Sequence, residues 1–255
     1  MERSGTVDKA LRVLEALHRA GGPVALAELA SKLRLPKPTL HRLLASLSAH
    51  DLVEQDAEGR YGLGVGLVRL GLGALSVDPV VRVARPELER AVRGFGETFF
   101  LVSARAGKLV VLDKVEGTGL LRAAPSVGSE VPVEETASGR LYLGIAPDAL
   151  RDSAQRLAKL PRGVVEAAVA RGYELNRGEW ISGMSVIAAP VLAAGRMHGT
   201  IACAAAAAQL NDARLREAIR RTRAVAERVS RALDGHKSDK VNARGSAREQ
   251  NEEAS

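Results

Sequence analysis

Apolar residues recur every three or four positions in three short segments near the start of the chain. This spacing predicts amphipathic helices over Val7–Arg19, Leu26–Leu33 and Lys37–His50. Gly21-Gly22-Pro23 ends the first helix, and Arg34-Leu35-Pro36 forms the turn before the third. The residues expected to face inward are Val7, Leu11, Leu14 and Leu17 in the first helix, Leu29, Ala30 and Leu33 in the second, and Leu40, Leu43, Leu44 and Leu47 in the third.

Two short extended runs follow, Leu52–Gln55 and Arg60–Leu63, and predict a β-hairpin. The intervening loop ends in Gly59, which readily takes the positive φ of a tight turn. Three helices and a hairpin make a winged helix-turn-helix, which we assign to residues 1–63. Residues 64–79 are apolar and glycine-rich and predict a connecting helix. Each glycine costs this helix roughly 1 kcal/mol relative to alanine, so we expect something to pack on it, such as a partner subunit.

Helical and extended patterns are mixed in residues 80–235, which predicts a separate α+β domain. The expected helices are Val80–Gly94, Leu141–Ala158, Val164–Arg171 and a long final helix capped by Asn211. The expected strands are Thr98–Ala104, Lys108–Val115, Gly119–Ala124, Met184–Leu192 and Gly199–Ala207. Residues 236–255 are polar, charged and free of proline, and are expected to be a disordered tail.

The composition narrows the class of protein. A chain of 255 residues suits two ordinary domains, and 46% apolar residues suffice for packed cores. Its net charge of +7 favours a polyanionic partner. The single Cys203 lies in an apolar run, where we expect a buried side chain, and it excludes an internal disulfide. No signal sequence or membrane-spanning run is recognisable, so we expect no membrane partner and a cytoplasmic location.

The third helix opens with cationic and hydrogen-bonding side chains, while its other face is leucine. A helix that enters the DNA major groove needs this layout, because its apolar side packs on its own domain and its polar start faces the bases. The residues expected to contact DNA, six from this helix and one from the wing, are Lys37, Pro38, Thr39, His41, Arg42, Ser46 and Arg60.

Each of these contacts has an alternative. Arg42 is expected to fork onto a guanine or to clamp a phosphate, with a solvated side chain as the weaker possibility. Lys37 and Thr39 lie at the helix start, where phosphate binding is favoured. His41 is as readily solvated as bound, and Ser46 would touch the DNA backbone. Arg60 is placed for the minor groove or a phosphate, unless it is an ordinary exposed strand residue.

The predicted DNA-binding part has little net charge. Residues 1–75 hold ten Lys and Arg against eight Asp and Glu, a net charge of +2. One such module recruits few phosphates, so specific binding is expected to require a dimer.

Two other classes of function, an enzyme and a protein-docking adaptor, fit the sequence less well. Gly62, Gly64 and Gly66 do not give a dinucleotide-binding motif, because Leu67 or Arg69 stands where the third glycine belongs. There is no P-loop, and the five histidines are scattered, so neither an enzyme, a metal site nor a cofactor is expected. A winged-helix adaptor that docks proteins without binding specific DNA remains the alternative function.

The chain as a whole, from about Thr6 to Gly235, resembles the IclR-type transcriptional regulators. The segments that carry the resemblance beyond the winged helix are Gly96-Glu97-Thr98, Val111-Leu112-Asp113-Lys114, Val127-Gly128 through Pro132, Thr136-Ala137-Ser138-Gly139-Arg140, Ala170-Arg171-Gly172-Tyr173, Gly183, Ala188-Ala189-Pro190-Val191 and Arg228-Val229-Ser230-Arg231-Ala232-Leu233. The resemblance implies a GAF- or PAS-like effector-binding domain, and a homodimer or homotetramer that binds a palindromic DNA operator.

The resemblance also implies where a small-molecule effector binds. The implied pocket residues are Leu120, Ala123, Ala137, Ser138, Gly139, Asn176, Met184 and Val186. Met184 and Val186 alternate and are equally explained as core strand residues, and Asn176 as a turn residue. Some family members carry Asp where Asn176 stands, so the effector is not transferable from them. Free N–H groups at a helix start favour a small carboxylate as effector.

Overall fold

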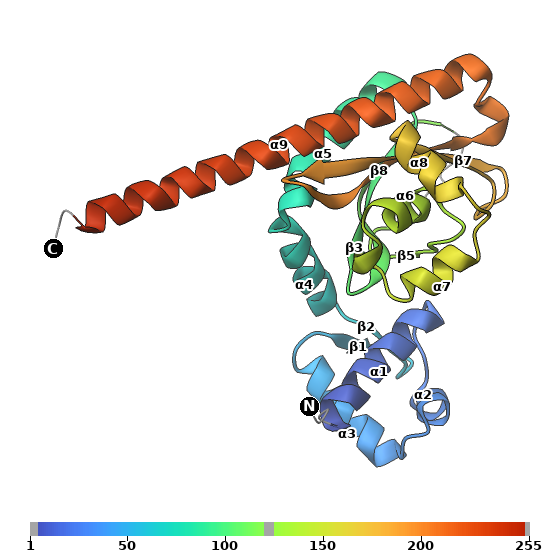
Figure 1. Cartoon of the computed structure of the whole chain (residues 1–255). Helices are drawn as coiled ribbons and strands as arrows, with labels where there is room; N and C mark the ends of the chain where they lie inside the picture. The colour runs from blue at the N-terminus through green and yellow to red at the C-terminus, as the bar shows by residue number, and fades with distance from the viewer. Residues whose placement is uncertain (1–4, 120–124, 253–255) are drawn as a thin grey trace. The chain divides into compact units, whose positions relative to one another are not determined.

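The computed structural model describes the backbone of residues 5–119 and 125–252, and side chains as far as Gly235. The chain divides into two compact units, Met1–Ser76 and Val77–Ser255. Figure 1 shows their elements coloured along the chain. The division falls within residues 64–79, the predicted connecting helix.

The N-terminal unit is the predicted winged helix-turn-helix. Its elements are α1 (Gly5–Ala20), α2 (Leu26–Leu33), α3 (Lys37–Ser48), β1 (Val53–Gln55), β2 (Tyr61–Leu63) and α4 (Val65–Ser76). The two strands pair antiparallel, and Tyr61 also exchanges backbone hydrogen bonds of 2.8 Å with Val24 in the loop before α2. The wing is thereby fixed to the three-helix core. The inward residues predicted for α2 and α3 are all buried.

The prediction for α1 was partly wrong. Val7 and Leu11 are 58% and 55% exposed, and the buried residues of this helix are Val13, Ala16 and Leu17. Val13 and Ala16 form a second apolar stripe on α1, and this stripe packs against the core of the N-terminal unit. The first two turns of α1 therefore present large apolar side chains to solvent.

The C-terminal unit is an α+β domain built on one antiparallel sheet. Its strands are β3 (Thr98–Arg105), β4 (Lys108–Val115), β5 (Glu130–Val131), β6 (Glu174–Arg177), β7 (Met184–Ala193) and β8 (Arg196–Ala206), in the spatial order β5-β4-β3-β8-β7-β6. Its helices are α5 (Pro79–Phe95), α6 (Ala137–Ile145), α7 (Ser153–Ala158), α8 (Val164–Arg171) and α9 (Asp212–Glu252), with 3-10 turns at Pro147–Ala149 and Ala207–Gln209.

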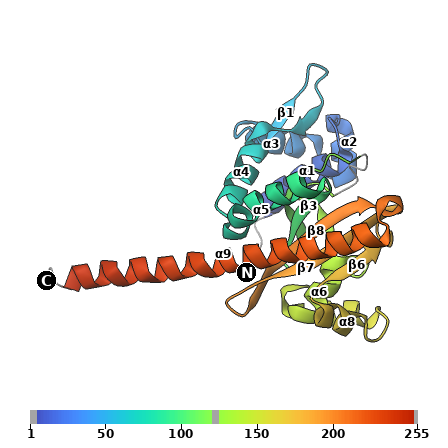
Figure 2. The same cartoon turned by 90° about the horizontal axis from the view of Figure 1, so that it is seen from above.

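Helices cover both faces of this sheet. Helices α5 and α9 lie on one face, and α6 and α8 lie on the other (Figures 1 and 2). In β3, Phe100 and Val102 join the core cluster around α6, so the alternating Phe99 and Leu101 face the other layer. Burial on both faces explains why these strands read as continuous apolar runs. Cys203 is fully buried in β8 as expected, and this burial raises the pKa of its thiol.

Three expectations for this unit differ from the structure. The helix predicted over Leu141–Ala158 is wrong: α6 ends at Ile145, because Pro147 lacks an N–H and Asp152 takes a φ of 52°. The short strands β5 and β6 were not predicted. Helix α9 begins directly after Asn211, the predicted cap, whose Oδ1 accepts from Arg214 N at 2.9 Å. The helix continues to Glu252, through residues 236–252 of the segment that was expected to be disordered. Apart from Gly119, the strand predicted over Gly119–Ala124 lies outside the described residues.

Candidate nucleic-acid interface and ligand pocket

The exposed face of α3 carries the predicted DNA-contacting side chains. Leu40, Leu43, Leu44 and Leu47 are buried against the rest of the unit. The opposite face exposes Lys37, Pro38, His41, Arg42 and Ser46, while Thr39 is half-buried. The structure therefore brings six of the seven predicted residues onto one surface, all from one helix.

The start of α3 is open to an anion. Pro36 occupies the N-cap position and supplies no side-chain cap, and Pro38 has no N–H. The N–H groups of Lys37 and Thr39 precede the first N–H that bonds within the helix, that of Leu40 to Pro36 O at 3.0 Å. The start of α3 therefore combines two free backbone donors with the positive end of the helix dipole and the Lys37 ammonium. This combination is suited to binding a phosphate.

Arg42 and Ser46 follow one turn apart on the exposed face. The Ser46 hydroxyl donates to the backbone oxygen of Arg42 at 3.1 Å, so it offers a ligand an acceptor rather than a donor. Among the described residues, the Arg42 guanidinium has no ion-pair partner. It is the side chain on this surface best able to make a bidentate contact.

Arg60 in the wing is differently placed. Its Nε lies 2.8 Å from Asp56 Oδ2 and its Nη2 lies 3.1 Å from Glu58 Oε2, so the guanidinium is held by the carboxylates of its own loop. Desolvation raises the pKa of Asp56, but hydrogen bonds from Arg60 outweigh it and leave the pKa below its usual value. A DNA contact by Arg60 stays a prediction, and it would compete with these two ion pairs.

The ligand pocket predicted for the second unit has a counterpart between the sheet and the start of α6. A narrow cavity of about 10 Å³ is lined by Phe100, Val131, Thr136, Ala137, Ser138, Asn176, Trp180 and Val186. Four of these were predicted, namely Ala137, Ser138, Asn176 and Val186. A cavity of this size has about the room of one water molecule, so a metabolite would enter only if part of the wall moved.

The start of α6 supplies the polar groups of this pocket. Thr136 caps the helix, because its Oγ1 accepts from Gly139 N at 3.2 Å. The Ser138 hydroxyl accepts from Thr200 Oγ1 at 2.8 Å and is buried, which leaves its own proton free to donate. The N–H groups of Ala137 and Ser138 precede the capped one, so an anionic group in the cavity would meet donors.

Gly139 and Met184 do not line the cavity. A Cβ on Gly139 would lie 1.8 Å from the backbone oxygen of Val133, so this glycine serves the close approach of α6 to the preceding segment. Met184 is a buried member of the core. The predicted pocket residues Leu120 and Ala123 lie outside the described residues.

A short loop with the only tryptophan closes one side of the pocket. Gly178 and Gly183, at φ values of 75° and 77°, bound the segment that carries Glu179 and Trp180. Arg140 in α6 is ion-paired with Glu179 and, at 3.3 Å, with Glu174. Asn176 donates from Nδ2 to Glu135 O and accepts from Glu179 N at 3.3 Å. These contacts hold the loop against the start of α6.

Some lining residues were missed by sequence reasoning. Phe100, Val131 and Thr136 come from three separate segments, and only the packing of α6 on the sheet brings them together. The sequence did carry a signal for Thr136, because threonine directly before a helical segment is a preferred N-cap residue. For Phe100 there was no signal, since both faces of β3 are apolar.

The described residues also bear on metal binding and on membrane insertion. Within the described residues, no three His, Cys, Asp or Glu side chains come together as a metal site would require. The described helices include none with the length and apolar character to cross a membrane.

Models of two protein domains match the chain and together span most of it. The IclR helix-turn-helix domain matches residues 6–57, and the bacterial transcriptional regulator IclR C-terminal domain matches residues 72–231. These findings define the class of protein, which is a two-domain transcriptional regulator with an N-terminal helix-turn-helix domain and a C-terminal α+β regulatory domain. The chain belongs to the IclR family of bacterial transcriptional regulators.

Known proteins agree with this assignment. A relative from Cupriavidus necator, described as the "Probable transcriptional regulator SauR", is 33% identical over 221 residues, which cover 81% of this chain and 86% of SauR. A structure described as "a putative transcriptional regulator RHA06195 from Rhodococcus sp. RHA1" has a TM-score of 0.79 at 20% identity, covering 91% of this chain and 98% of its own. An IclR homologue of Microbacterium hydrocarbonoxydans, solved with 4-hydroxybenzoate, has a TM-score of 0.76 at 17% identity, covering 91% and 100%.

The protein is therefore a DNA-binding transcriptional regulator and not an enzyme. The comparisons give no support to the alternative of a protein-docking adaptor. The winged helix-turn-helix and the α+β domain predicted from the sequence are both confirmed.

Proposed function

We propose that this regulator binds a palindromic operator as a homodimer or a pair of dimers, and that a small effector molecule sets its affinity. The observation that carries the DNA part is the exposed face of α3. It combines open backbone donors at the helix start with Arg42 one turn later, which has no ion-pair partner among the described residues. The first group positions a phosphate and the second reads a base edge.

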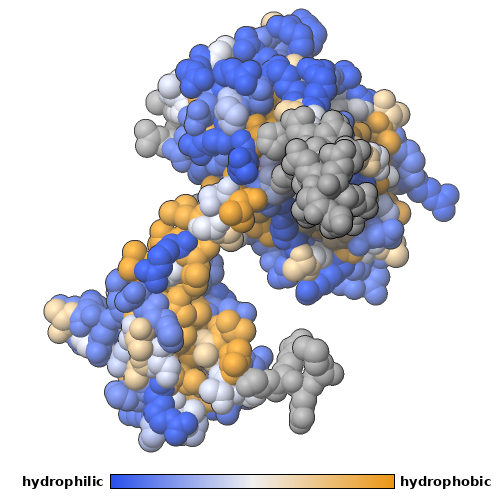
Figure 3. Space-filling model, turned by 90° about the vertical axis from the view of Figure 1, so that its left-hand side faces the viewer, coloured by the Kyte–Doolittle hydropathy of each residue, from blue (hydrophilic) through white to orange (hydrophobic). Residues whose placement is uncertain are grey.

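The apolar surface of α4 supports association of two copies. Val65, Val68, Leu70 and Leu72 are between 57% and 65% exposed, and of the whole helix only Gly66 is buried. Figure 3 shows exposed apolar side chains on the N-terminal unit. Val65, Val68 and Leu72 follow the three-and-four spacing of a helix that packs on another helix. A symmetric pair of α4 helices would bury them and give the glycine-rich helix its missing partner.

The effector proposal rests on the start of α6. Donors from Ala137 and Ser138 face a cavity with apolar walls, which suits a small molecule with one carboxylate and an apolar body. The Microbacterium relative was solved with such a molecule, 4-hydroxybenzoate. Because the cavity is almost filled, binding would displace the Trp180 loop or its neighbours. Linkage then requires that the effector and the operator change one another's affinity by the same factor.

The experiment that tests this function starts with selection of genomic fragments by the purified protein at two salt concentrations. One palindromic consensus is expected. Recovery of no consensus, with binding lost uniformly as salt rises, would refute specific recognition.

The selected operator then tests Arg42. Arg42→Ala should weaken operator binding by roughly 10- to 100-fold, the range of one bidentate base contact, without changing the melting temperature, because the side chain is exposed. Arg42→Lys is the matched control, since it keeps the charge and loses the fork. Full affinity in Arg42→Lys would assign Arg42 to a phosphate, and full affinity in Arg42→Ala would remove it from the interface.

A further inference from the structure

A cluster of four charged side chains holds the loop that closes the ligand pocket. Arg140 on α6 is ion-paired with Glu174 at 3.3 Å and with Glu179, and Arg171 is ion-paired with Glu174. Only 12% of the Arg140 side chain and 6% of the Glu174 side chain are exposed, against 42% for Glu179. Two positive and two negative charges balance, so the cluster is neutral while the loop is closed.

Glu179 is the member of this cluster that belongs to the loop. It lies between Gly178 and Gly183, which both take a positive φ, and next to Trp180, which lines the cavity. Among the described residues its carboxylate has one ion-pair partner, Arg140. The cavity has room for about one water molecule, so we expect a larger ligand to displace the loop. Entry of a ligand therefore separates Glu179 from Arg140.

Opening of the loop leaves a positive charge that is no longer balanced. Glu174 stays beside Arg140, because it belongs to β6 and not to the loop, but it also neutralises Arg171. The open cluster thus has two positive charges and one negative charge. Within the described chain, Arg140 Nε is buried without a hydrogen-bond partner even when the loop is closed. Because an unbalanced buried charge is costly, the open cluster favours an anion in the place of Glu179.

The contact between Arg140 and Glu179 indicates which anion fits. Arg140 donates from Nη1 to Glu179 Oε1 at 3.4 Å and from Nη2 to Glu179 Oε2, which is a bidentate arrangement. The carboxylate of a small molecule has the same two oxygens at the same spacing. Such a carboxylate can therefore take over both contacts.

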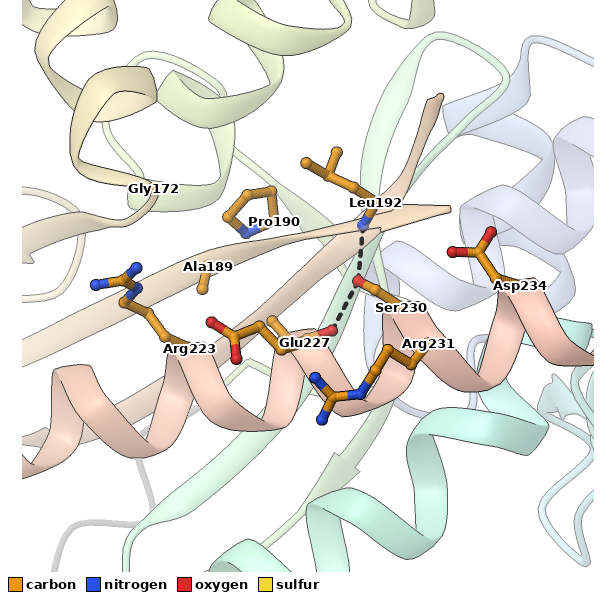
Figure 4. Close-up of a pocket in the computed structure, with 10 residues that line it drawn as sticks. Gly172, Ala189, Pro190, Leu192, Arg223, Glu227, Ser230, Arg231 and Asp234 are labelled. Atoms are coloured by element: carbon orange, nitrogen blue, oxygen red, sulfur yellow. Dashed lines mark hydrogen bonds between the residues drawn. The ribbon is translucent and has the colours of Figure 1, made fainter. Parts of the chain in front are cut away.

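A larger groove on the same unit offers an anion weaker contacts. It has a volume of about 410 Å³ and lies between α9 and β7 (Figure 4). Its arginines, Arg223 and Arg231, are exposed. The Ser230 hydroxyl accepts from Leu192 N at 2.9 Å and donates to Ala226 O at 2.8 Å, so it is already engaged. Because contacts between charges in solvent are weak and screened by salt, we expect an anion to prefer the buried guanidinium on α6.

We propose that Arg140 anchors the carboxylate of the effector, and that Glu179 occupies the place of this carboxylate while no effector is bound. The proposal rests on the effector-binding function proposed above. As the loop opens, the carboxylate of the effector replaces the Glu179 carboxylate on the Arg140 guanidinium. The exchange keeps the cluster neutral, so it selects an anionic molecule over an uncharged molecule of the same shape.

Quenching of Trp180 fluorescence tests the exchange without knowledge of the effector. Acrylamide is uncharged and reports the exposure of Trp180, whereas iodide also reports the local charge. Glu179→Gln releases the loop and leaves the cluster positive, so iodide quenching should rise by about twofold more than acrylamide quenching at fixed ionic strength. Arg140→Gln releases the loop but leaves the cluster negative, so the ratio of iodide to acrylamide quenching should fall below that of the wild type. Glu166→Gln, an exposed position on α8, is the control and should change neither.

Binding of benzoate and of its uncharged analogue benzamide, measured by calorimetry, tests the anchor. Glu179→Gln removes the competing carboxylate and should bind benzoate about fivefold more tightly than the wild type. Arg140→Gln should weaken benzoate binding by about tenfold or more and lose the preference for benzoate over benzamide. Arg140→Lys keeps the positive charge and should retain this preference. Circular dichroism checks folding, and Glu179→Gln, at an exposed position, decides the test if Arg140→Gln does not fold.

The outcomes separate this proposal from the proposed function. An iodide response in Glu179→Gln no larger than its acrylamide response, or benzoate binding that does not tighten in this variant, would overturn the exchange. Operator binding is measured on the same samples by a separate assay. Benzoate binding that depends on Arg140 but leaves operator affinity unaltered would count against a carboxylate as the effector and leave the exchange in place.

Discussion

Leu72 offers a quantitative test of the α4 surface. Its side chain is 62% exposed in the isolated subunit, and Leu72→Ala removes three carbon atoms. Each buried CH₂ contributes about 0.8 kcal/mol. Only the exposed fraction of the side chain can become buried in the dimer, so Leu72→Ala should remove roughly 1.5 kcal/mol of association free energy per subunit. A symmetric interface counts it twice, so the dimer should be weakened by about 3 kcal/mol, or roughly 150-fold in its dissociation constant.

Sedimentation equilibrium measures this constant directly. Leu157→Ala on α7 is the matched control, because that leucine is also partly exposed, at 43%. The free energy of unfolding of the separated subunit should change little, since Leu72 contributes little burial there. An association constant for Leu72→Ala within about twofold of its parent would refute α4 as the dimer surface.

Two further predictions concern α6 and the loop beside the cavity. Gly139→Ala should lower the free energy of unfolding by about 3 kcal/mol or more, measured by urea denaturation, because its Cβ would overlap the Val133 oxygen. Gly22→Ala, where φ is not positive and a Cβ meets nothing within 4 Å, is the comparison, and an equal loss in both would count against the overlap. Trp180 is the only tryptophan and lines the cavity. Its fluorescence should therefore shift on titration with a small aromatic carboxylate that also changes operator affinity. A carboxylate that changes operator affinity while the fluorescence stays constant would place the effector elsewhere.

The parts of the fold that were predicted are those set by local pattern. The bounds of α2 agree with the sequence prediction, and α3 differs only at its end, because leucine spacing and flanking prolines define both helices locally. The parts that were missed depend on distant partners. Strand β6 has a polar sequence, Glu174-Leu175-Asn176-Arg177, and is a strand only because it pairs with β7.

The ligand pocket shows the same division. Ala137 and Ser138 follow the helix cap Thr136 and line the cavity, and their contact with an effector stays a prediction. Phe100 and Val131 reach it through the sheet order, which no local pattern encodes. On α1, two apolar stripes compete for one core, and only the packing decides that Val13 and not Val7 is buried.

The wing bears on how this regulator searches a genome. Arg60 is bound by Asp56 and Glu58, so the hairpin loop offers DNA one negative charge more than positive, within a unit of net charge +2. Attraction to random sequence grows with the number of phosphates neutralised, so this protein should spend little time on non-target DNA. Few molecules are then sequestered by the millions of competing sites in a chromosome, and a small cellular pool suffices to occupy the operator.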